Sequence, residues 1–281
     1  STNKIDFGKV SYLLTEEKFF TIKNVGSSAI TIQKIYIWGS DSIYFKIVEP
    51  NNYPFNLYSL QETNIKLIYM ANAIGVKNSV LSIISSDVIS PNYNINLTGE
   101  TISPKVSTLQ SINFGNVKTN YKKDSTIFIK NIGDGTLYIF DIKKTGTDTS
   151  SFEILSYPDK ISPSLSDSLV FSFLPKSVGN KSAVINIYSN DITSHTSSIT
   201  LSGKGVEPKI NVNPGTLSFG DIYIGKRKDS CLSIINSGEA DLIINDISIT
   251  GADSNVFNVF GFTLPMIIKP SESKNIFVSS Y

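Results

Sequence analysis

The sequence predicts an all-β protein built from three tandem repeats, and three observations lead to this prediction. A Phe-Gly pair recurs in "IDFGKV", "INFGNV" and "LSFGDI", with Phe7, Phe114 and Phe219 spaced by 107 and 105 residues. The same residue types follow each pair at fixed offsets. Apolar and polar residues alternate with the period of two that is typical of half-buried strands, and no segment keeps a helical spacing for three turns.

Each copy of the repeat carries four marker positions. An Asn-x-Gly begins 17 residues after the Phe, an Asp follows at 34 and a second Phe at 38. Agreement at four positions in three copies indicates a repeat of about 100 residues. The repeat-defining residues are Phe7, Gly8, Gly26 and Phe45, then Phe114, Gly115, Gly133 and Phe152, and finally Phe219, Gly220, Gly238 and Phe257.

Each repeat contains seven or eight short strands with turn signals every eight to twelve residues, which predicts an immunoglobulin-like β-sandwich. We expect the two Phe of each copy to anchor the core and the Gly after the first Phe to mark a bulge. The Asn-x-Gly predicts a tight turn whose residues tolerate positive φ. The repeated Asp, at Asp41, Asp148 and Asp253, predicts an Asx-type cap on its own loop.

The predicted domains span residues 1–102, 103–206 and 207–281. The first lacks part of its first strand and the last lacks its final two strands. A Pro-Lys pair opens the second and third repeats almost directly after the preceding strand, so we expect sandwiches stacked end to end in a stiff, slightly bent rod. Two interpretations of the incomplete ends stay open: a fragment of a longer array, or a subunit whose end domains are completed by strands from its neighbours.

Composition excludes several classes of function. The net charge of +1 gives no basic surface for nucleic acid, and no stretch approaches the roughly 18 apolar residues of a membrane span, so no membrane insertion is expected. The single Cys231 excludes an internal disulfide.

The chain offers no predicted catalytic centre. Its one histidine, His195, and Cys231 fall in different repeats, which excludes a Cys-His or Ser-His hydrolase and a zinc site of ordinary construction. We therefore expect a protein that is not an enzyme and has no cofactor and no metal. Whether the loop aspartates bind calcium stays open.

Features present in one copy are the better candidates for binding. Trp38 stands where the other copies have Thr145 and Thr250, and it precedes the segment "NNYPFNLYSL". Exposed aromatic residues on a loop favour a glycan or protein contact surface; the alternative is that they pack locally. The candidate contact residues are Trp38, Tyr53, Phe55 and Tyr58.

The pattern of the repeat resembles the ASH/Hydin group of immunoglobulin-like domains, which are related to the major sperm protein fold, and it is most similar to bacterial tandem versions called choice-of-anchor D. The resemblance covers essentially the whole chain and is specific for fold. The residues that carry it in the second copy are Phe114-Gly115, Asn131, Gly133, Gly146, Asp148, Phe152, Ser189-Asn190-Asp191 and Leu201-Ser202-Gly203.

The resemblance implies a non-catalytic module, either in bacterial secreted or surface-anchored proteins or in cilium and centrosome scaffolds. The first hypothesis is a structural or adhesive module of an extracellular or cell-surface protein, with protein partners that include self-assembly into a filament by strand complementation. The second is a carbohydrate-recognition module that uses exposed aromatic residues. The third is an intracellular cytoskeletal scaffold.

Overall fold

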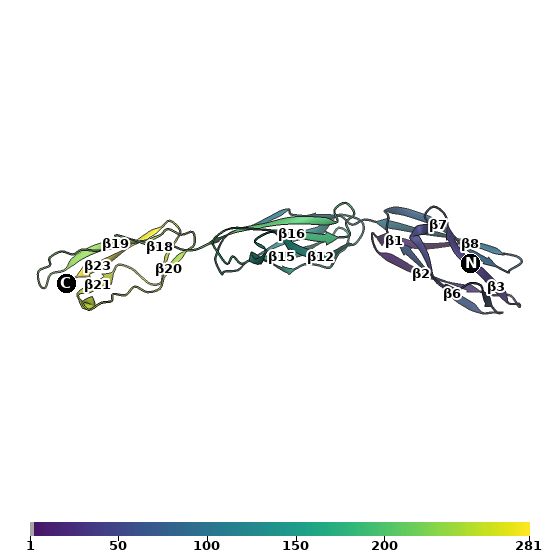
Figure 1. Ribbon diagram of the computed structural model, residues 1–281, viewed down its shortest axis with the longest axis horizontal. Coiled ribbons are helices and arrows are strands. Elements are labelled where there is room, and N and C mark those ends of the chain that lie inside the picture. Colours follow the sequence, from purple (N-terminus) through teal and green to yellow (C-terminus); the bar gives the residue numbers. More distant parts are fainter. Residues whose placement is uncertain (1–2) are drawn as a thin grey trace.

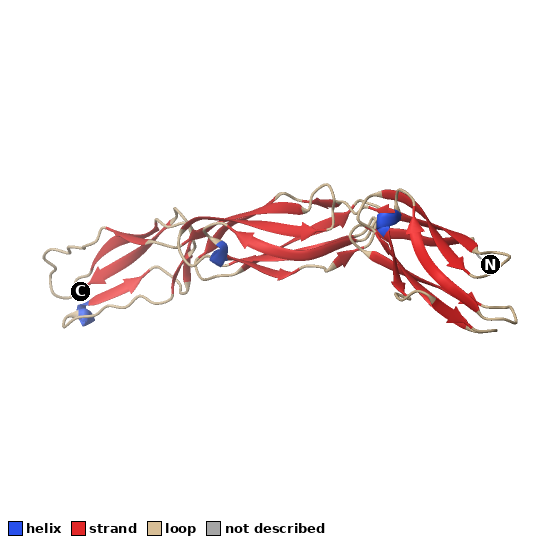
Figure 2. Ribbon diagram, turned by 45° about the vertical axis from the view of Figure 1, so that its right-hand side comes forward, coloured by secondary structure: helices blue, strands red, loops and turns tan. Residues whose placement is uncertain are grey.

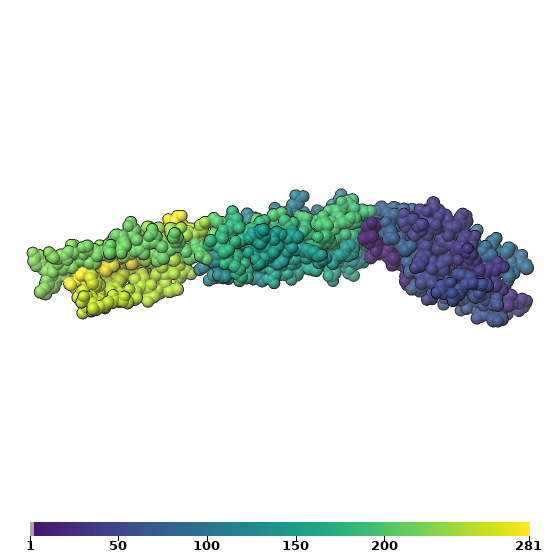
Figure 3. All heavy atoms as spheres, in the orientation of Figure 1, coloured from purple at the N-terminus to yellow at the C-terminus, as the bar shows by residue number. Residues whose placement is uncertain are grey.

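The computed structural model describes residues 3–281 and shows three β-units in a row. Figures 1 and 3 show them end to end, with the N-terminal and C-terminal units at opposite ends of an elongated molecule. Its only helices in this range are three single 3-10 turns: η1 (Ser42–Tyr44), η2 (Thr149–Ser151) and η3 (Ser254–Val256). The predicted fold class, tandem immunoglobulin-like sandwiches, is confirmed (Figure 2).

The first unit packs a five-stranded sheet against a three-stranded sheet. The larger sheet has the order β1 (Lys4–Ser11), β8 (Asn92–Ile102), β7 (Gly75–Ser85), β3 (Ile30–Trp38) and β5 (Phe55–Leu57). The smaller sheet has the order β2 (Thr15–Lys23), β6 (Glu62–Met70) and β4 (Phe45–Glu49).

The second unit repeats this arrangement and adds one short strand, β9, to its smaller sheet. The larger sheet has the order β10 (Ser111–Lys118), β17 (Thr196–Val206), β16 (Gly179–Ser189), β12 (Leu137–Thr145) and β14 (Lys160–Ile161). The other sheet has the order β13 (Phe152–Ser156), β15 (Ser166–Phe173), β11 (Lys123–Asn131) and β9 (Val106–Thr108).

The Phe-Gly phrase forms the edge strand of the larger sheet in both units. β1 pairs parallel with β8, and β10 pairs parallel with β17. The register shifts between Asp6 and Lys9 in β1, at Gly8, and at the matching place in β10, at Gly115. Both glycines have positive φ, 72° and 69°, so the bulge predicted at this position is present.

The third unit is more open than the other two. It has the sheet β18 (Ile210–Asn213), β19 (Lys228–Asn236), β23 (Ser273–Ser280) and β21 (Phe257–Phe260), and the pair β20 (Leu242–Ile244) and β22 (Met266–Ile268). Within residues 3–281, no strands correspond in this unit to β16 and β17. The parallel partner of the Phe-Gly phrase is thus absent here, and residues 216–222 around Phe219 and Gly220 form no strand.

The buried apolar residues form three separate clusters, one in each unit. In the second unit the rings of Phe114, Phe152 and Phe173 lie 4.9–6.0 Å apart, and the first unit has the same trio with a tyrosine in the third place. A glycine of the last strand, Gly203, lies against the Phe173 ring, because a Cβ there would come within 2.6 Å of it. The two marker Phe of the first and second units therefore form the centre of their cores, as expected. In the third unit, Phe219 and Phe257 are only partly buried and lie outside the apolar cluster, so the expectation fails there.

The Asn of the Asn-x-Gly turn holds four backbone groups at once. Asn131 is fully buried, and its amide nitrogen donates to the carbonyls of Gly135 and Ile161, at 2.7 and 3.0 Å. Its Oδ1 accepts from the backbone N–H of Gly133 and of Lys105, at 3.0 and 3.2 Å. These bonds connect two strands, a turn and the linker. We call Asn131 an internal pin, meaning a buried side chain that holds these segments together. Asn24 and Asn236 make the corresponding carbonyl bonds in their own units.

The Gly of the turn has a different role from the one predicted. Gly26, Gly133 and Gly238 do not have positive φ. A Cβ at Gly133 would lie 2.5 Å from the backbone nitrogen of Lys105, and one at Gly238 would collide with the linker at 207–209. In the second and third units, the glycine is therefore required for space, because the preceding linker crosses directly over it.

Candidate functional sites

The two linkers are three residues long and are bonded into the turn of the following unit. Residues 103–105 join β8 to β9, and residues 207–209 join β17 to β18. The backbone N–H of Ile132 donates to Lys105 O at 2.8 Å, and the backbone N–H of Ser237 donates to Lys209 O at the same distance. Because both linkers are fixed by backbone bonds as well as by the buried Asn, neither can act as a free hinge.

Side chains of the second unit also reach back to the first. The amide nitrogen of Asn190 donates to the carbonyl of Tyr12 in the first unit, at 3.2 Å, and to that of Thr136 in its own unit, at 3.1 Å. The backbone N–H of Thr136 donates to the hydroxyl of Ser11, at 2.8 Å. Asn190 is fully buried, so these bonds belong to a closed junction.

The junction between the second and third units carries charged contacts. The hydroxyl of Thr119 donates to a carboxylate oxygen of Glu207, at 2.8 Å, and Lys204 forms an ion pair of 2.6 Å with Glu239. The ion pair is exposed and contributes little by itself. The backbone bonds of the linker therefore do more to fix this junction than the charges.

Asp191 ties the entry of the second unit to its last hairpin. Its carboxylate is almost fully buried and accepts from the backbone N–H of Val106 at 2.8 Å, from both the N–H and hydroxyl of Thr193, and from the N–H of Ser194. Burial opposes ionisation of this carboxylate, but the hydrogen bonds outweigh burial and lower the pKa of Asp191.

Replacing this carboxylate should destabilise the second unit in a pH-dependent way. A folded-state pKa below the unfolded one gives stabilisation that is complete above the unfolded pKa and is lost as the pH falls through the folded one. Asp191→Asn should therefore lower the free energy of unfolding by about 1–3 kcal/mol at pH 7 and by less in acid. Urea denaturation at a series of pH values, with the exposed Asp134→Asn as control, measures this; an equal loss at every pH would contradict it.

Trp38 lies on the outer face of the larger sheet in the first unit. Its indole nitrogen donates to the hydroxyl of Ser82 on the neighbouring strand β7, at 2.7 Å, although the strand partner of Trp38 is Val80. The bond draws the ring across β7. Ser82 is only 3% exposed on a face that otherwise meets solvent, while Trp38 remains 49% exposed. The edge of the indole that carries the N–H therefore meets the serine, while about half of the tryptophan stays open to water.

Polar side chains surround this ring. On β8 the exposed residues Asn92, Asn94 and Asn96 alternate with buried ones and so share one face of the sheet. Trp38 and Asn96 also line a hollow of about 410 Å³. Tyr36, two residues before Trp38 on the same face, is partly exposed, with Lys34 placed 5.2 Å from the centre of its ring.

The other candidate contact residues lie elsewhere. Phe55 is in β5, which pairs with residues 30–32 at the end of β3 opposite Trp38. Tyr53 and Phe55 pack against the core with their rings 5.9 Å apart, and burial raises the pKa of Tyr53. Tyr58 is 66% exposed. The structure therefore does not gather Trp38 and the Tyr-rich segment into one surface.

The loop aspartates bond to a strand, which corrects the prediction of an Asx cap. None of the three side chains caps its own 3-10 turn. Asp41 Oδ2 accepts from the backbone N–H of Asn78 at 2.9 Å, and Asp148 Oδ2 accepts from that of Ser182 at 3.1 Å. These carboxylates hold the loop against β7 and β16. Asp253 has no such strand beside it in the part of the chain that the structure describes.

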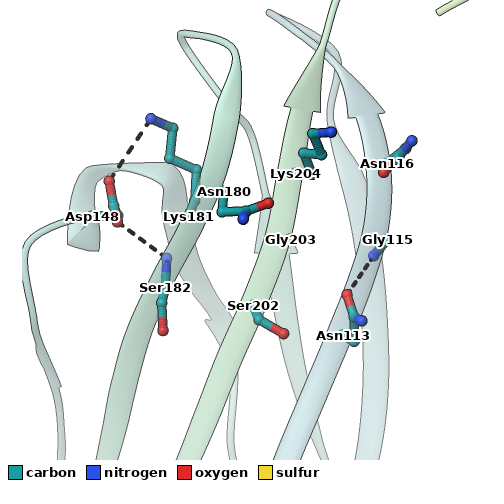
Figure 4. A pocket seen from close by; sticks show the side chains of 10 residues that line it. All are labelled: Asn113, Gly115, Asn116, Asp148, Asn180, Lys181, Ser182, Ser202, Gly203 and Lys204. Atoms are coloured by element: carbon teal, nitrogen blue, oxygen red, sulfur yellow. Dashed lines mark hydrogen bonds and ion pairs between the residues drawn. The ribbon is translucent and has the colours of Figure 1, made fainter. Parts of the chain in front are cut away.

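A polar hollow of about 470 Å³ lies beside Asp148 in the second unit (Figure 4). Lys181 forms a long ion pair of 3.9 Å with Asp148, as the dashed line shows, and Lys204 is engaged by the third unit. Asp148 is the only carboxylate that lines the hollow. The arrangement therefore offers no pair of carboxylates for acid–base chemistry.

The remaining reactive side chains are far apart. His195 is exposed in the loop after β16, with its ring 6.4 Å from that of Tyr12, and Cys231 is exposed on β19 of the third unit. Residues 3–281 contain no cluster of three His, Cys, Asp or Glu that could hold a metal. No helix in this range is long enough to cross a bilayer.

Sequence reasoning missed two functional residues. It assigned Asn131 to a turn and Asn190 to a family pattern, whereas one is the internal pin and the other closes the junction. The signal for Asn131 was its recurrence at a fixed offset in all three copies. Asn190 had a weaker signal, because the first copy has Ser86 in its place.

Comparison with known proteins finds a family model that matches the middle of the chain. Residues 104–204 match the model of a HYDIN/CFA65/VesB-like, Ig-like domain. No curated protein matches the chain.

Several solved structures are similar at low identity. One is a protein of unknown function from Porphyromonas gingivalis W83, with 13% identity and a TM-score of 0.33 over 73% of this chain and 97% of that one. Another is the ASH/PapD-like domain 7 of human CEP192, with 18% identity and a TM-score of 0.30 over 37% and 87%. A third is the VesB protease of Vibrio cholerae, with 13% identity and a TM-score of 0.30 over 35% and 31%, so the match spans about a third of that chain.

Proposed function

We propose, from the premise that residues 104–204 form a HYDIN/CFA65/VesB-like Ig-like domain, that the protein is a non-catalytic structural rod. Its three units, at residues 1–102, 103–206 and 207–281, hold their neighbours in line and present their sheet faces and loops to partners. As the resemblance to choice-of-anchor D repeats implies, we place the rod in a bacterial-type secreted or cell-surface protein, where it serves as a spacer or an adhesive module.

The single observation that carries the proposal is the construction of the junctions. Both linkers have three residues, and both are bonded into the next unit by backbone hydrogen bonds and by the buried Asn of the turn. A flexible tether would need a longer segment with free backbone groups. Both linkers are thus attached to the turn of the following unit in the same way.

Small-angle X-ray scattering tests the rod. The longest strands have 11 residues and so span about 36 Å, which places the maximum dimension of three units in line at about 110 Å or more. We expect a distance distribution with the long tail of a rod. If the scattering data can be fitted only by an ensemble in which the three units take many relative orientations, the proposal is wrong.

A second candidate, assembly by strand addition, is favoured by the third unit. The core residues Leu232 and Val259 of this unit are only partly buried, and no strands equivalent to β16 and β17 cover them within the described range. A hairpin added from a neighbouring molecule would cover this apolar side and supply a partner for residues 216–222. Sedimentation velocity should then show association that rises with concentration, and a single monomeric species at all concentrations would refute it.

A further inference from the structure

The first and second units build the same three-strand relay on the outer face of the larger sheet. In the first unit, the indole N–H of Trp38 on β3 donates to Ser82 on β7, at 2.7 Å. The hydroxyl of Ser82 donates in turn to Oδ1 of Asn94 on β8, also at 2.7 Å. Ser82 and Asn94 are paired in the register, whereas Trp38 is paired with Val80 and reaches Ser82 diagonally across the sheet.

The second unit has Thr145, Asn186 and Ser198 in the same three places, and its hydrogen bonds run in the opposite direction across the sheet. Ser198 on β17 donates to Oδ1 of Asn186 on β16, at 2.8 Å, and the amide nitrogen of Asn186 donates to the hydroxyl of Thr145 on β12, at 3.1 Å. Thr145 and Ser198 are exposed, and Asn186 is half-buried. In both units the polar side chains of the relay are hydrogen-bonded to one another. The hydrogen bonds alone therefore give no reason for an indole in the first unit.

The indole adds an exposed apolar surface that folding does not require. Trp38 is 49% exposed, so a large part of its ring meets solvent. The bond from Ser82 also orients Asn94, since its Oδ1 is occupied and its two amide protons are left to point away from the serine. A fixed ring thus lies beside an amide with free donors.

We infer that this face of the first unit is a binding platform for a neutral glycan. The platform consists of Trp38, Tyr36, Asn94 and Asn96. Trp38 provides the stacking surface for the apolar face of a pyranose ring, and the asparagine amides bond its hydroxyl groups. The hollow beside Trp38 and Asn96 accommodates the neighbouring sugar.

The chemistry of the platform favours a sugar over other ligands. A saccharide presents C–H groups on one face and hydroxyls at its rim, and the platform offers a flat aromatic surface with donors and acceptors at its edge. The charges nearby are already engaged: Lys4 pairs with Asp6 at 3.0 Å, and Lys34 lies over the ring of Tyr36. Lys4 is the one charged residue among those described that line the hollow, so the platform has no cluster of charge to select an acidic or basic polymer.

The single tryptophan makes the test direct, because Trp38 is the only one in the chain. Its fluorescence is followed in the whole protein during titration with soluble cello-, xylo-, manno- and chito-oligosaccharides at concentrations up to millimolar. Retention on insoluble cellulose, xylan, mannan and chitin is measured in parallel. We expect a saturable change in fluorescence with at least one oligosaccharide, and retention on the polymer of the same sugar.

The second unit supplies the matched control. The triple exchange Trp38→Thr, Ser82→Asn and Asn94→Ser gives the first unit the relay that the second unit already folds with, and its thermal unfolding should stay close to that of the original. Retention on the polymer should fall by about tenfold or more. Tyr58→Ala, which removes an exposed aromatic residue elsewhere in the first unit, should leave retention unchanged.

Three results would overturn the inference. The first is the absence of any fluorescence change or retention across the four sugars. The second is retention that survives the triple exchange in a folded protein. The third is concentration-dependent association of the chain that the triple exchange abolishes, which would make the face a protein contact. Binding at this face does not depend on the stiffness of the junctions, so each proposal can fail alone.

Discussion

Asn131→Ala should lower the free energy of unfolding of the second unit by about 3 kcal/mol or more, because it leaves several buried backbone groups without partners. The carbonyls of Gly135 and Ile161 and the N–H groups of Gly133 and Lys105 all bond to this side chain. The loss should appear in urea denaturation and as faster hydrogen exchange in β9 and β11.

The control for this substitution is Asn116→Ala in the same unit. Asn116 is exposed, so its removal should change stability by no more than about 0.5 kcal/mol. If the free energy of unfolding of Asn131→Ala is within about 1 kcal/mol of that of the original protein, the side chain does not hold the linker and the strands together. The description of Asn131 as a pin would then be wrong.

Gly133→Ala should disturb the junction between the first and second units. The new Cβ would lie 2.5 Å from the nitrogen of Lys105 and from the carbonyl oxygen of Ser103, and these backbone atoms cannot rotate away. The linker must therefore shift, at a cost of about 1–3 kcal/mol. We expect a shorter maximum dimension or a broader distribution in small-angle scattering, and loss of protection at the N–H of Ile132.

The chain contains its own control for this effect. At Gly26, the same position of the first unit, an added Cβ would meet only Asn24 Oδ1, at 3.3 Å. Gly26→Ala should therefore leave the scattering curve unchanged. If the two substitutions alter the shape equally, the linker is not what makes the glycine necessary in the second unit.

The sandwich architecture could be predicted because its signals are local. The geometry of a single strand is enough to interpret the alternation of Ile127 and Ile129. The same holds for the bulge glycines Gly8 and Gly115. The aromatic core followed from the regular spacing of the marker Phe. These features recur in three copies of the repeat, which makes a chance occurrence improbable.

The junctions and the platform could not be predicted in the same way, since they depend on contacts between distant residues. The need for Gly133 comes from a linker that crosses it, and not from the φ of the turn. The orientation of Trp38 depends on Ser82, which lies 44 residues later. The burial of Tyr53 and Phe55 depends on β5 joining the larger sheet, and composition alone suggested an exposed loop.

The parallel pairing of the Phe-Gly strand decides how the second unit responds to tension. β10 and β17 run in the same direction and are paired from Ser111 with Thr200 to Lys118 with Val206. The chain enters the unit through the short strand β9, which leads directly into β10 from the side of the first unit, and it leaves from the end of β17, beside the third. A pull on the two ends of the molecule therefore slides these strands past each other, and their hydrogen bonds carry the load together instead of opening one by one.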